Sequence, residues 1–202
     1  MSLEFWKERN RQRFEIRKPC VSDWYKLCEF VKALRIEHEN FVTEFGSEIF
    51  GPFVIEGGYG LENCESAFEW LEHLKRLEDN LGTLFPVEVY LVVDKVDNEV
   101  VGIVGLRFVD DDLVCHDLFG NVAMTIALEH RRFGIGSFVM DWVMRNWKEM
   151  SSRVLGKTSN KIRVSHRETN LASKEFITGL GGEFVDKVKM SKDLIWRYKI
   201  TV

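Results

Sequence analysis

The chain of 202 residues has no long apolar run and no excess of basic residues. Its apolar runs are much too short to span a bilayer, and its first residues lack the apolar stretch of a signal peptide. The net charge of −4 disfavours broad electrostatic capture of nucleic acid, and the basic residues between Lys7 and Lys18 alternate with glutamates, as in a solvated segment. These absences predict a cytoplasmic protein that binds neither membranes nor nucleic acid.

Motifs for disulfides or metal binding are also missing. The four cysteines show neither CxxC pairing nor histidines at zinc-ligand spacing, so free thiols are the default interpretation. An acidic run at residues 110–112, followed by His116 and Asp117, is more typical of a solvated loop than of a metal site. We therefore expect no metal.

The composition that is present fits one ordinary globular domain. Hydrophobic residues make up 45% and charged residues 30% of the chain, and 202 residues are enough for a single domain with a full core, which we expect to span residues 1–202. Periodicity predicts helices that begin near Trp24, Ala67, Ile135 and Asn170. Strands are expected at residues 13–17, 87–93, 100–109, 122–128, 162–165, 184–188 and 194–200. By themselves, these patterns indicate a mixed α/β domain.

The most informative segment is the turn at residues 131–137, between a predicted strand and a predicted helix. It reads Arg-Arg-Phe-Gly-Ile-Gly-Ser, and its glycines Gly134 and Gly136 have no Cβ that would keep an anion away from the backbone. A helix start leaves N–H groups unpaired, and the helix dipole and the arginines add positive charge. The segment therefore predicts a pyrophosphate site.

Three phosphate-binding patterns can be compared with this turn. A dinucleotide fingerprint needs a third glycine where Val139 stands, and a P-loop ending at Gly156-Lys157-Thr158 needs a glycine where Ser151 stands. The third pattern, Arg/Gln-x-x-Gly-x-Gly, is filled by Arg131, Gly134 and Gly136. Here the chain resembles the GNAT superfamily of acyl-CoA-dependent N-acetyltransferases.

A second motif lies at the distance that this resemblance requires. Residues 170–173, Asn-Leu-Ala-Ser, followed by a glycine turn at residues 181–182, are similar to the family's Asn-x-x-Ala/Ser helix. Leu106-Arg107 and Gly120-Asn121-Val122 are also similar to a bacterial subgroup of predicted acetyltransferases. The resemblance covers about residues 85–190, and residues 20–84 are expected to supply the acceptor side.

The resemblance implies a single-domain GNAT-like α/β (α+β) fold, with a mixed central sheet flanked by helices and with acetyl-CoA as co-substrate. Backbone groups near Ile126 and Leu128 would hold the pantetheine arm, although these residues could equally be only part of the core strand. Asn170 and Ser173 would reach the cofactor from their helix, and a helix N-cap is the alternative role for Asn170. The residues expected at the pyrophosphate are Arg131, Arg132, Phe133, Gly134, Ile135, Gly136 and Ser137.

The chain departs from the family where proton transfer is concerned. Ile177 stands where many members carry the tyrosine that protonates the leaving thiolate, and no side chain of the phosphate strand takes up a proton near neutral pH. His166 is the first candidate for a base because its imidazole titrates near neutrality, and Glu88 and Tyr90 are the others. A structural, hydrogen-bonded role for His166 is the alternative.

These observations predict an acetyltransferase that acts by direct attack of a primary amine on acetyl-CoA. The amine would belong to a small molecule or a peptide and would arrive between the glycine-rich loop at residues 46–60 and the acidic loop at residues 109–119. A non-catalytic acyl-CoA sensor or partner-binding module on the same fold is the alternative. The aromatic-rich helices leave open whether the protein forms a homodimer.

Overall fold

The computed structural model describes residues 3–45, 64–79, 86–109, 120–190 and 193–202. These residues form two compact units, each of which is described by itself. The first consists of Met1–Gly105 and Met124–Val139, and the second of Leu106–Ala123 and Met140–Val202. The glycine-rich loop and the acidic residues 110–117 lie outside the described residues. A single domain over residues 1–202 stays a prediction.

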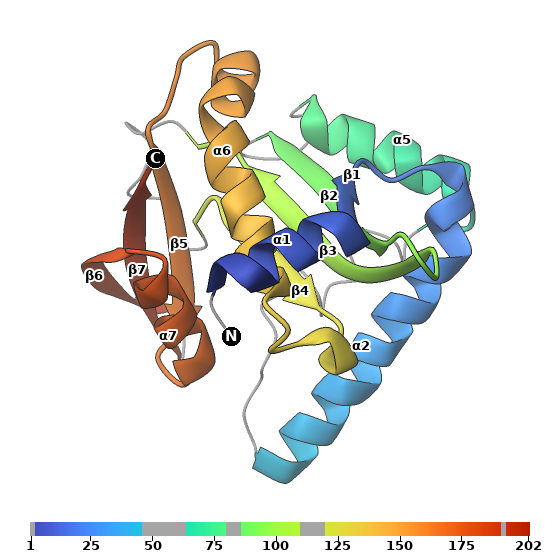
Figure 1. Ribbon diagram of the computed structural model, residues 1–202, viewed down its shortest axis with the longest axis horizontal. Helices are drawn as coiled ribbons and strands as arrows, with labels where there is room; N and C mark the ends of the chain where they lie inside the picture. The colour runs from blue at the N-terminus through green and yellow to red at the C-terminus, as the bar shows by residue number, and fades with distance from the viewer. Residues whose placement is uncertain (1–2, 46–63, 80–85, 110–119, 191–192) are drawn as a thin grey trace. The chain divides into compact units, whose positions relative to one another are not determined.

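The first unit is built on an antiparallel sheet with helices (Figure 1). Its sheet has the strand order β1-β2-β3-β4. β1 pairs antiparallel with β2, in a register that sets Phe14 opposite Asp94 and Arg17 opposite Leu91. The elements are α1 (Leu3–Arg13), β1 (Phe14–Arg17), the 3-10 turn η1 (Val21–Asp23), α2 (Trp24–Phe45), α5 (Ala67–Glu78), β2 (Val87–Asp94), β3 (Glu99–Arg107), β4 (Val122–Ile126) and the 3-10 turn η4 (Leu128–His130).

The second unit contains a three-stranded sheet of order β5-β7-β6, in which both pairs of neighbours are antiparallel. A register shift between Phe184 and Asp186 makes a bulge in β6. Within the described residues, no helix of either unit is long and apolar enough to cross a membrane. The elements are α6 (Ile135–Leu155), whose first turn belongs to the first unit, β5 (Lys161–Arg167), α7 (Leu171–Gly179), β6 (Glu183–Met190) and β7 (Asp193–Thr201).

The predicted order of strands and helices is confirmed from β1 onward, but three features differ from the sequence prediction. Helix α1 was not predicted, because its alternating charges make no apolar stripe. β4 ends at Ile126, so Leu128 lies in the η4 turn rather than in the strand. In place of one mixed central sheet, the strands form two sheets, and β4 and β5 belong to different ones.

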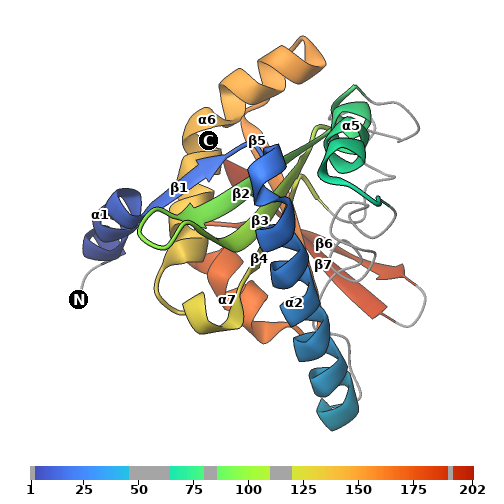
Figure 2. The ribbon, with the colours of Figure 1, turned by 90° about the vertical axis from the view of Figure 1, so that its right-hand side faces the viewer.

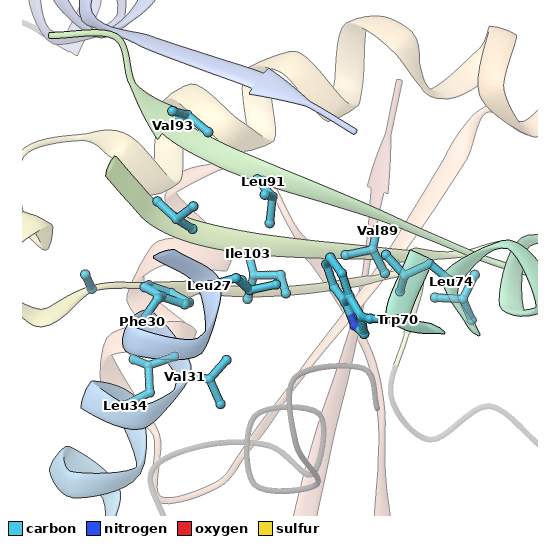
Figure 3. Packing of buried hydrophobic residues seen from close by; sticks show 13 residues of the cluster. Leu27, Phe30, Val31, Leu34, Trp70, Leu74, Val89, Leu91, Val93 and Ile103 are labelled. Carbon is cyan, nitrogen blue, oxygen red and sulfur yellow. The ribbon is translucent and has the colours of Figure 1, made fainter. Parts of the chain in front are cut away.

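The core of the first unit lies between one face of its sheet and the helices α2 and α5 (Figure 3). Alternate residues of β2, from Val87 to Val93, enter this core, as the two-residue period of a strand requires. The largest side chain in this core is that of Trp70 in α5, which is fully buried. The helices also contribute Leu27, Phe30, Val31, Leu34 and Leu74, and Val100, Ile103 and Ala127 complete the cluster. The helices predicted near Trp24 and Ala67 are therefore confirmed, and these apolar residues form their buried faces.

Helix α1 is fixed at its end to the turn between β2 and β3 (Figure 2). The backbone N–H of Lys95 donates to Arg13 O at 2.9 Å, and Arg13 Nε donates to the buried carboxylate of Asp94 at 2.7 Å. Burial raises the pKa of Asp94, but the hydrogen bonds from Arg13 and from the Val96 N–H, together with the positive charge nearby, outweigh burial and hold that pKa below its usual value. The last turn of α1 therefore has a defined position on the sheet.

The last two residues of β3, Leu106 and Arg107, belong to the second unit, where Asn121 joins Arg107 to β5. Its side chain is 4% exposed, donates from Nδ2 to Arg107 O at 2.9 Å, and accepts at Oδ1 from the N–H of Arg163 at 2.7 Å. Its own N–H donates to Arg163 O at 2.7 Å. Gly120 precedes it with φ +74°, and a Cβ there would lie 2.7 Å from Arg163 O, so only glycine fits this close approach.

Replacing Asn121 with alanine should destabilise the protein by about 2 to 4 kcal/mol, because two backbone groups would each lose a buried partner. Asn146→Ala is the matched control, since its Nδ2 bonds only one turn back to Trp142 O and alanine favours helices. Urea unfolding of both variants measures the difference. Equal losses for the two asparagines would contradict a bridging role for Asn121.

Candidate functional site

The site begins at the outer edge of β4, which is the last strand of its sheet. The N–H of Ala127 donates inward to Val101 O at 2.9 Å. Because backbone groups of successive strand residues point to opposite sides, the N–H and C=O of Ile126 face the outer edge. An exposed strand edge offers hydrogen bonds to an extended partner. This position suits the predicted role of Ile126 toward a pantetheine arm.

Arg131 modifies that expectation, because its side chain already uses one of these edge groups. Its Nε donates to Ile126 O at 2.8 Å and thereby ties the loop back to the end of β4. The Ile126 carbonyl is thus occupied, while its N–H still faces the edge. The motif arginine acts here first as a brace for the corner between strand and loop.

The loop after the η4 turn has a special backbone conformation. Arg132 has φ +65° and Gly134 has φ +75°, which is the left-handed region. Glycine adopts it without cost, whereas an arginine does so only where its surroundings hold it there. The side chain of Arg132 is exposed, and those of Leu128 and Phe133 are 60% and 51% exposed. The loop therefore presents its arginine to solvent and is not fixed by burying its own side chains.

The start of α6 provides backbone donors that no side chain of the N-cap satisfies. Its first helical bond runs from the N–H of Phe138 to Gly134 O at 2.9 Å, so the N–H groups of Ile135, Gly136 and Ser137 have no partner inside the helix. Gly134 occupies the N-cap position and has no side chain with which to cap them. Ile135 is 1% exposed and anchors this turn in the core.

The starts of α5 and α7 differ from that of α6. At α5, Ser66 Oγ accepts from the N–H of Glu69 at 3.3 Å. At α7, Asn170 Oδ1 accepts from the N–H of Ser173 at 3.0 Å. Each of these helices thus satisfies a donor with its own cap. Gly134 offers no such cap to the first turn of α6, and the helix dipole there favours an anionic acceptor.

Asn170 and Ser173 belong to the second unit, in the first turn of α7. The bond between them confirms the N-cap as a role for Asn170, and its Nδ2 is not needed for that cap. A further role of either residue toward a cofactor stays a prediction. The structure thus brings Ile126, Leu128 and residues 131–137 together in the first unit, and describes the α7 residues separately.

His166 is buried on β5, at 6% exposure, among aromatic side chains of β7. Its Nδ1 lies 2.6 Å from Arg167 O, which can only accept, so Nδ1 carries the proton. Nε2 lies 3.3 Å from the Tyr198 hydroxyl, which then donates to it. The rings of Trp196 and Tyr198 stack on the imidazole, with centroid-to-centroid distances of 5.9 and 5.4 Å. This geometry favours the structural alternative for His166 over a catalytic base.

The remaining candidates for proton transfer also have partners. The hydroxyl of Tyr90 donates to Glu88 Oε2 at 2.6 Å, both side chains are buried, and Lys18 Nζ lies 3.8 Å from the same carboxylate. Ile177 is buried in α7 and has no group that exchanges a proton. Among the described residues, no group of three His, Cys, Asp or Glu side chains could hold a metal ion.

One contributor to the site could not be found from sequence. Asn10 of α1 is 2% exposed, and its Nδ2 donates to Phe133 O in the loop at 2.9 Å. The two residues stand 123 positions apart, and nothing in the local pattern of the basic N-terminal segment marks Asn10. The contact lies entirely within the first unit.

Replacing His166 with glutamine should lower the melting temperature, because the stacked ring and one of its hydrogen bonds are lost. The pH profile of any acetyl transfer should keep its shape between about pH 6 and 9, since both ring nitrogens are engaged. Rates across this range for wild type and variant provide the check. A profile that loses its alkaline-rising limb in the variant would instead identify His166 as the base.

Comparison with known proteins finds similar folds among solved structures but no match by sequence. No protein-family model and no curated protein matches the sequence. Solved structures do match over nearly the whole chain. The microcin C7 self-immunity acetyltransferase MccE, in complex with acetyl-CoA and AMP, is 10% identical, with a TM-score of 0.63 and coverage of 94% of this chain and 93% of its own.

Two further structures agree. The ribosomal L7/L12 alpha-N-protein acetyltransferase RimL, in complex with coenzyme A, is 12% identical, with a TM-score of 0.60 and coverage of 94% of each chain. A chimera of the spermidine N-acetyltransferase SpeG from Vibrio cholerae and hSSAT is 15% identical, with a TM-score of 0.56 and coverage of 94% and 95%. At such identities the likeness concerns the fold alone. The chain has the α+β fold of the GNAT acetyltransferases.

Proposed function

We propose that this protein is an acetyl-CoA-dependent N-acetyltransferase that acetylates a primary amine of a small molecule or a peptide by direct attack. The observation that carries the proposal is the start of α6 at Gly134, where the first-turn N–H groups have no partner inside the helix, directly after a left-handed loop and close in sequence to β4, the last strand of its sheet. The fold adds support, because structures that share it were solved with acetyl-CoA or coenzyme A.

The chemistry of the donor set fits the diphosphate of coenzyme A. Three backbone N–H groups, from Ile135 to Ser137, are available at the positive end of the helix dipole. The exposed guanidinium of Arg132 adds a mobile positive charge. The outer N–H of Ile126 would donate to a carbonyl of the pantetheine arm, as an edge strand pairs with an extended peptide. In the second unit, Asn170 and Ser173 are proposed as further contacts.

Acetyl-CoA supplies an acetyl group activated as a thioester. Transfer forms a bond from the amine nitrogen to the carbonyl carbon and breaks the bond from that carbon to sulfur, and the proton lost by the amine balances the departing thiolate. Ile177 cannot donate that proton, and His166 is held in two hydrogen bonds. The chain would then accelerate the reaction mainly by holding the two reactants in a productive orientation.

The class of acceptor follows from the reaction rather than from a described pocket. A primary amine must reach the thioester in its neutral form to attack. The names of the similar proteins include a polyamine, spermidine, and a protein α-amino group as acceptors. We therefore propose primary amines as the class, which covers both, and the acidic residues expected in the segment 109–119 would favour cationic ones.

A non-catalytic acyl-CoA sensor is the second candidate function. It is favoured by Ile177 in the place of the family's tyrosine and by the engagement of both ring nitrogens of His166. Both functions require the same binding site, so binding alone does not separate them. A panel of amines does, because an enzyme turns over at least one of them whereas a sensor binds acetyl-CoA and releases it unchanged or slowly hydrolysed.

Gly136→Trp should abolish the binding of acetyl-CoA, because an indole at the second position of α6 would cover the N–H donors of the first turn. Gly179→Trp is the matched control: a Cβ at Gly179, in the last turn of α7, meets no described atom within 4 Å. Calorimetric titration of acetyl-CoA into wild type and both variants is the measurement, with circular dichroism to verify folding.

We expect micromolar binding by wild type and by Gly179→Trp, and no heat of binding for a folded Gly136→Trp. Binding that survives in Gly136→Trp would remove the start of α6 from the site. Absence of binding by the wild type would contradict both the enzyme and the sensor.

A further inference from the structure

Asn10 is unusual for its position in α1. The neighbouring residues Glu8, Arg9, Arg11 and Gln12 are exposed, whereas the Asn10 side chain is 2% exposed. Burying an amide is costly unless its polar atoms find partners. Its Nδ2 finds one in Phe133 O, at 2.9 Å. This hydrogen bond connects the N-terminal helix to the loop that precedes α6.

The carbonyl that accepts from Asn10 lies in the part of the loop with left-handed backbone conformation. Phe133 lies between Arg132 and Gly134, the two residues of the loop with left-handed φ. In a planar trans peptide the C=O and the N–H point in opposite directions. Holding Phe133 O toward α1 therefore turns the N–H of Gly134 away from α1. That N–H directly precedes the unpaired donors of the first turn of α6.

The end of the helix that carries Asn10 is itself held in place by contacts with the rest of the first unit. Arg13, one turn later, bonds the buried carboxylate of Asp94, and Lys95 Nζ donates to Arg11 O at 3.0 Å. The ring of Phe14, which follows α1, packs edge to face against the ring of His130, with 6.3 Å between the ring centroids. The amide of Asn10 is thus held in place by groups outside the loop, and the loop is held by it.

We propose that Asn10 is a positioning residue for coenzyme A binding: through Phe133 O it holds the loop of residues 131–134 in the conformation that aims backbone donors at the diphosphate. The proposal rests on the proposed function, since it concerns the same site. It adds the N-terminal helix α1 to the binding machinery. Asn10 touches no ligand in this account, because its effect passes through the loop backbone.

Two substitutions test the proposal. Asn10→Ala removes the donor, and Asn10→Asp keeps the shape but faces the Phe133 carbonyl with an oxygen that cannot donate when ionised. Ser66→Ala is the control for lost stability, because it removes a helix cap whose hydrogen bond lies within α5, from the N–H of Glu69 to Ser66 Oγ. Acetyl-CoA binding is measured by calorimetry, and backbone order of residues 132–134 by ¹⁵N relaxation without ligand.

We expect both Asn10 variants to bind acetyl-CoA about tenfold more weakly, with lower order parameters in the loop, while Ser66→Ala retains the wild-type affinity and loop order. Wild-type affinity in a folded Asn10→Asp would overturn the proposal and leave the proposed function intact. Weaker binding with unchanged loop order, or an equal loss in Ser66→Ala, would also overturn it. No binding by the wild type would instead overturn the proposed function, and this inference with it.

Discussion

Backbone groups that leave a sheet or start a helix must still find hydrogen-bond partners, and in this chain three asparagines meet that requirement at critical places. Asn121 satisfies backbone groups of both β3 and β5. Asn170 caps α7, and Asn10 holds the loop before α6. A short side chain with both a donor and an acceptor suits such positions. Each asparagine fixes a segment whose conformation the regular elements alone would leave undetermined.

The same requirement for hydrogen-bond partners distinguishes the start of α6 from the starts of α5 and α7. α5 and α7 each use a side chain to satisfy a donor of the first turn, whereas α6 begins after a glycine. Leaving these donors without a cap costs stability unless something else binds them. A site that accepts an anion repays this cost only when the ligand is present. The proposed function therefore follows from a local departure from ordinary capping, within a fold that similar structures use to bind acetyl-CoA or coenzyme A.

Much of the fold could be predicted from the sequence because its signals are local. The stripe of α2, the alternation in β2 and the glycines at residues 134 and 136 each depend on neighbours along the chain. Helix α1 could not be predicted, because its stability comes from contacts with distant residues such as Asp94 and Phe133 rather than from an apolar face. The hydrogen bond between Asn121 and Arg163 likewise joins residues 42 positions apart, which no local pattern indicates.

The site shows the same division between local and distant signals. The motif at residues 131–137 was recognisable, but the brace from Arg131 to Ile126 O shows that a motif residue can serve the backbone rather than the ligand. For His166, sequence showed only an ionisable ring at a strand end. Its burial against Trp196 and Tyr198 depends on the pairing of β5 with β7, which no local pattern specifies.

The central claim is that the first turn of α6 receives the diphosphate of coenzyme A, and titration of ¹⁵N-labelled protein with acetyl-CoA tests it most directly. If this turn binds the diphosphate, the amide resonances of Gly134, Ile135, Gly136 and Ser137 show the largest shifts and saturate together. Pyrophosphate alone should move the same amides in the same direction. Saturable binding that leaves these four amides unmoved would contradict the account.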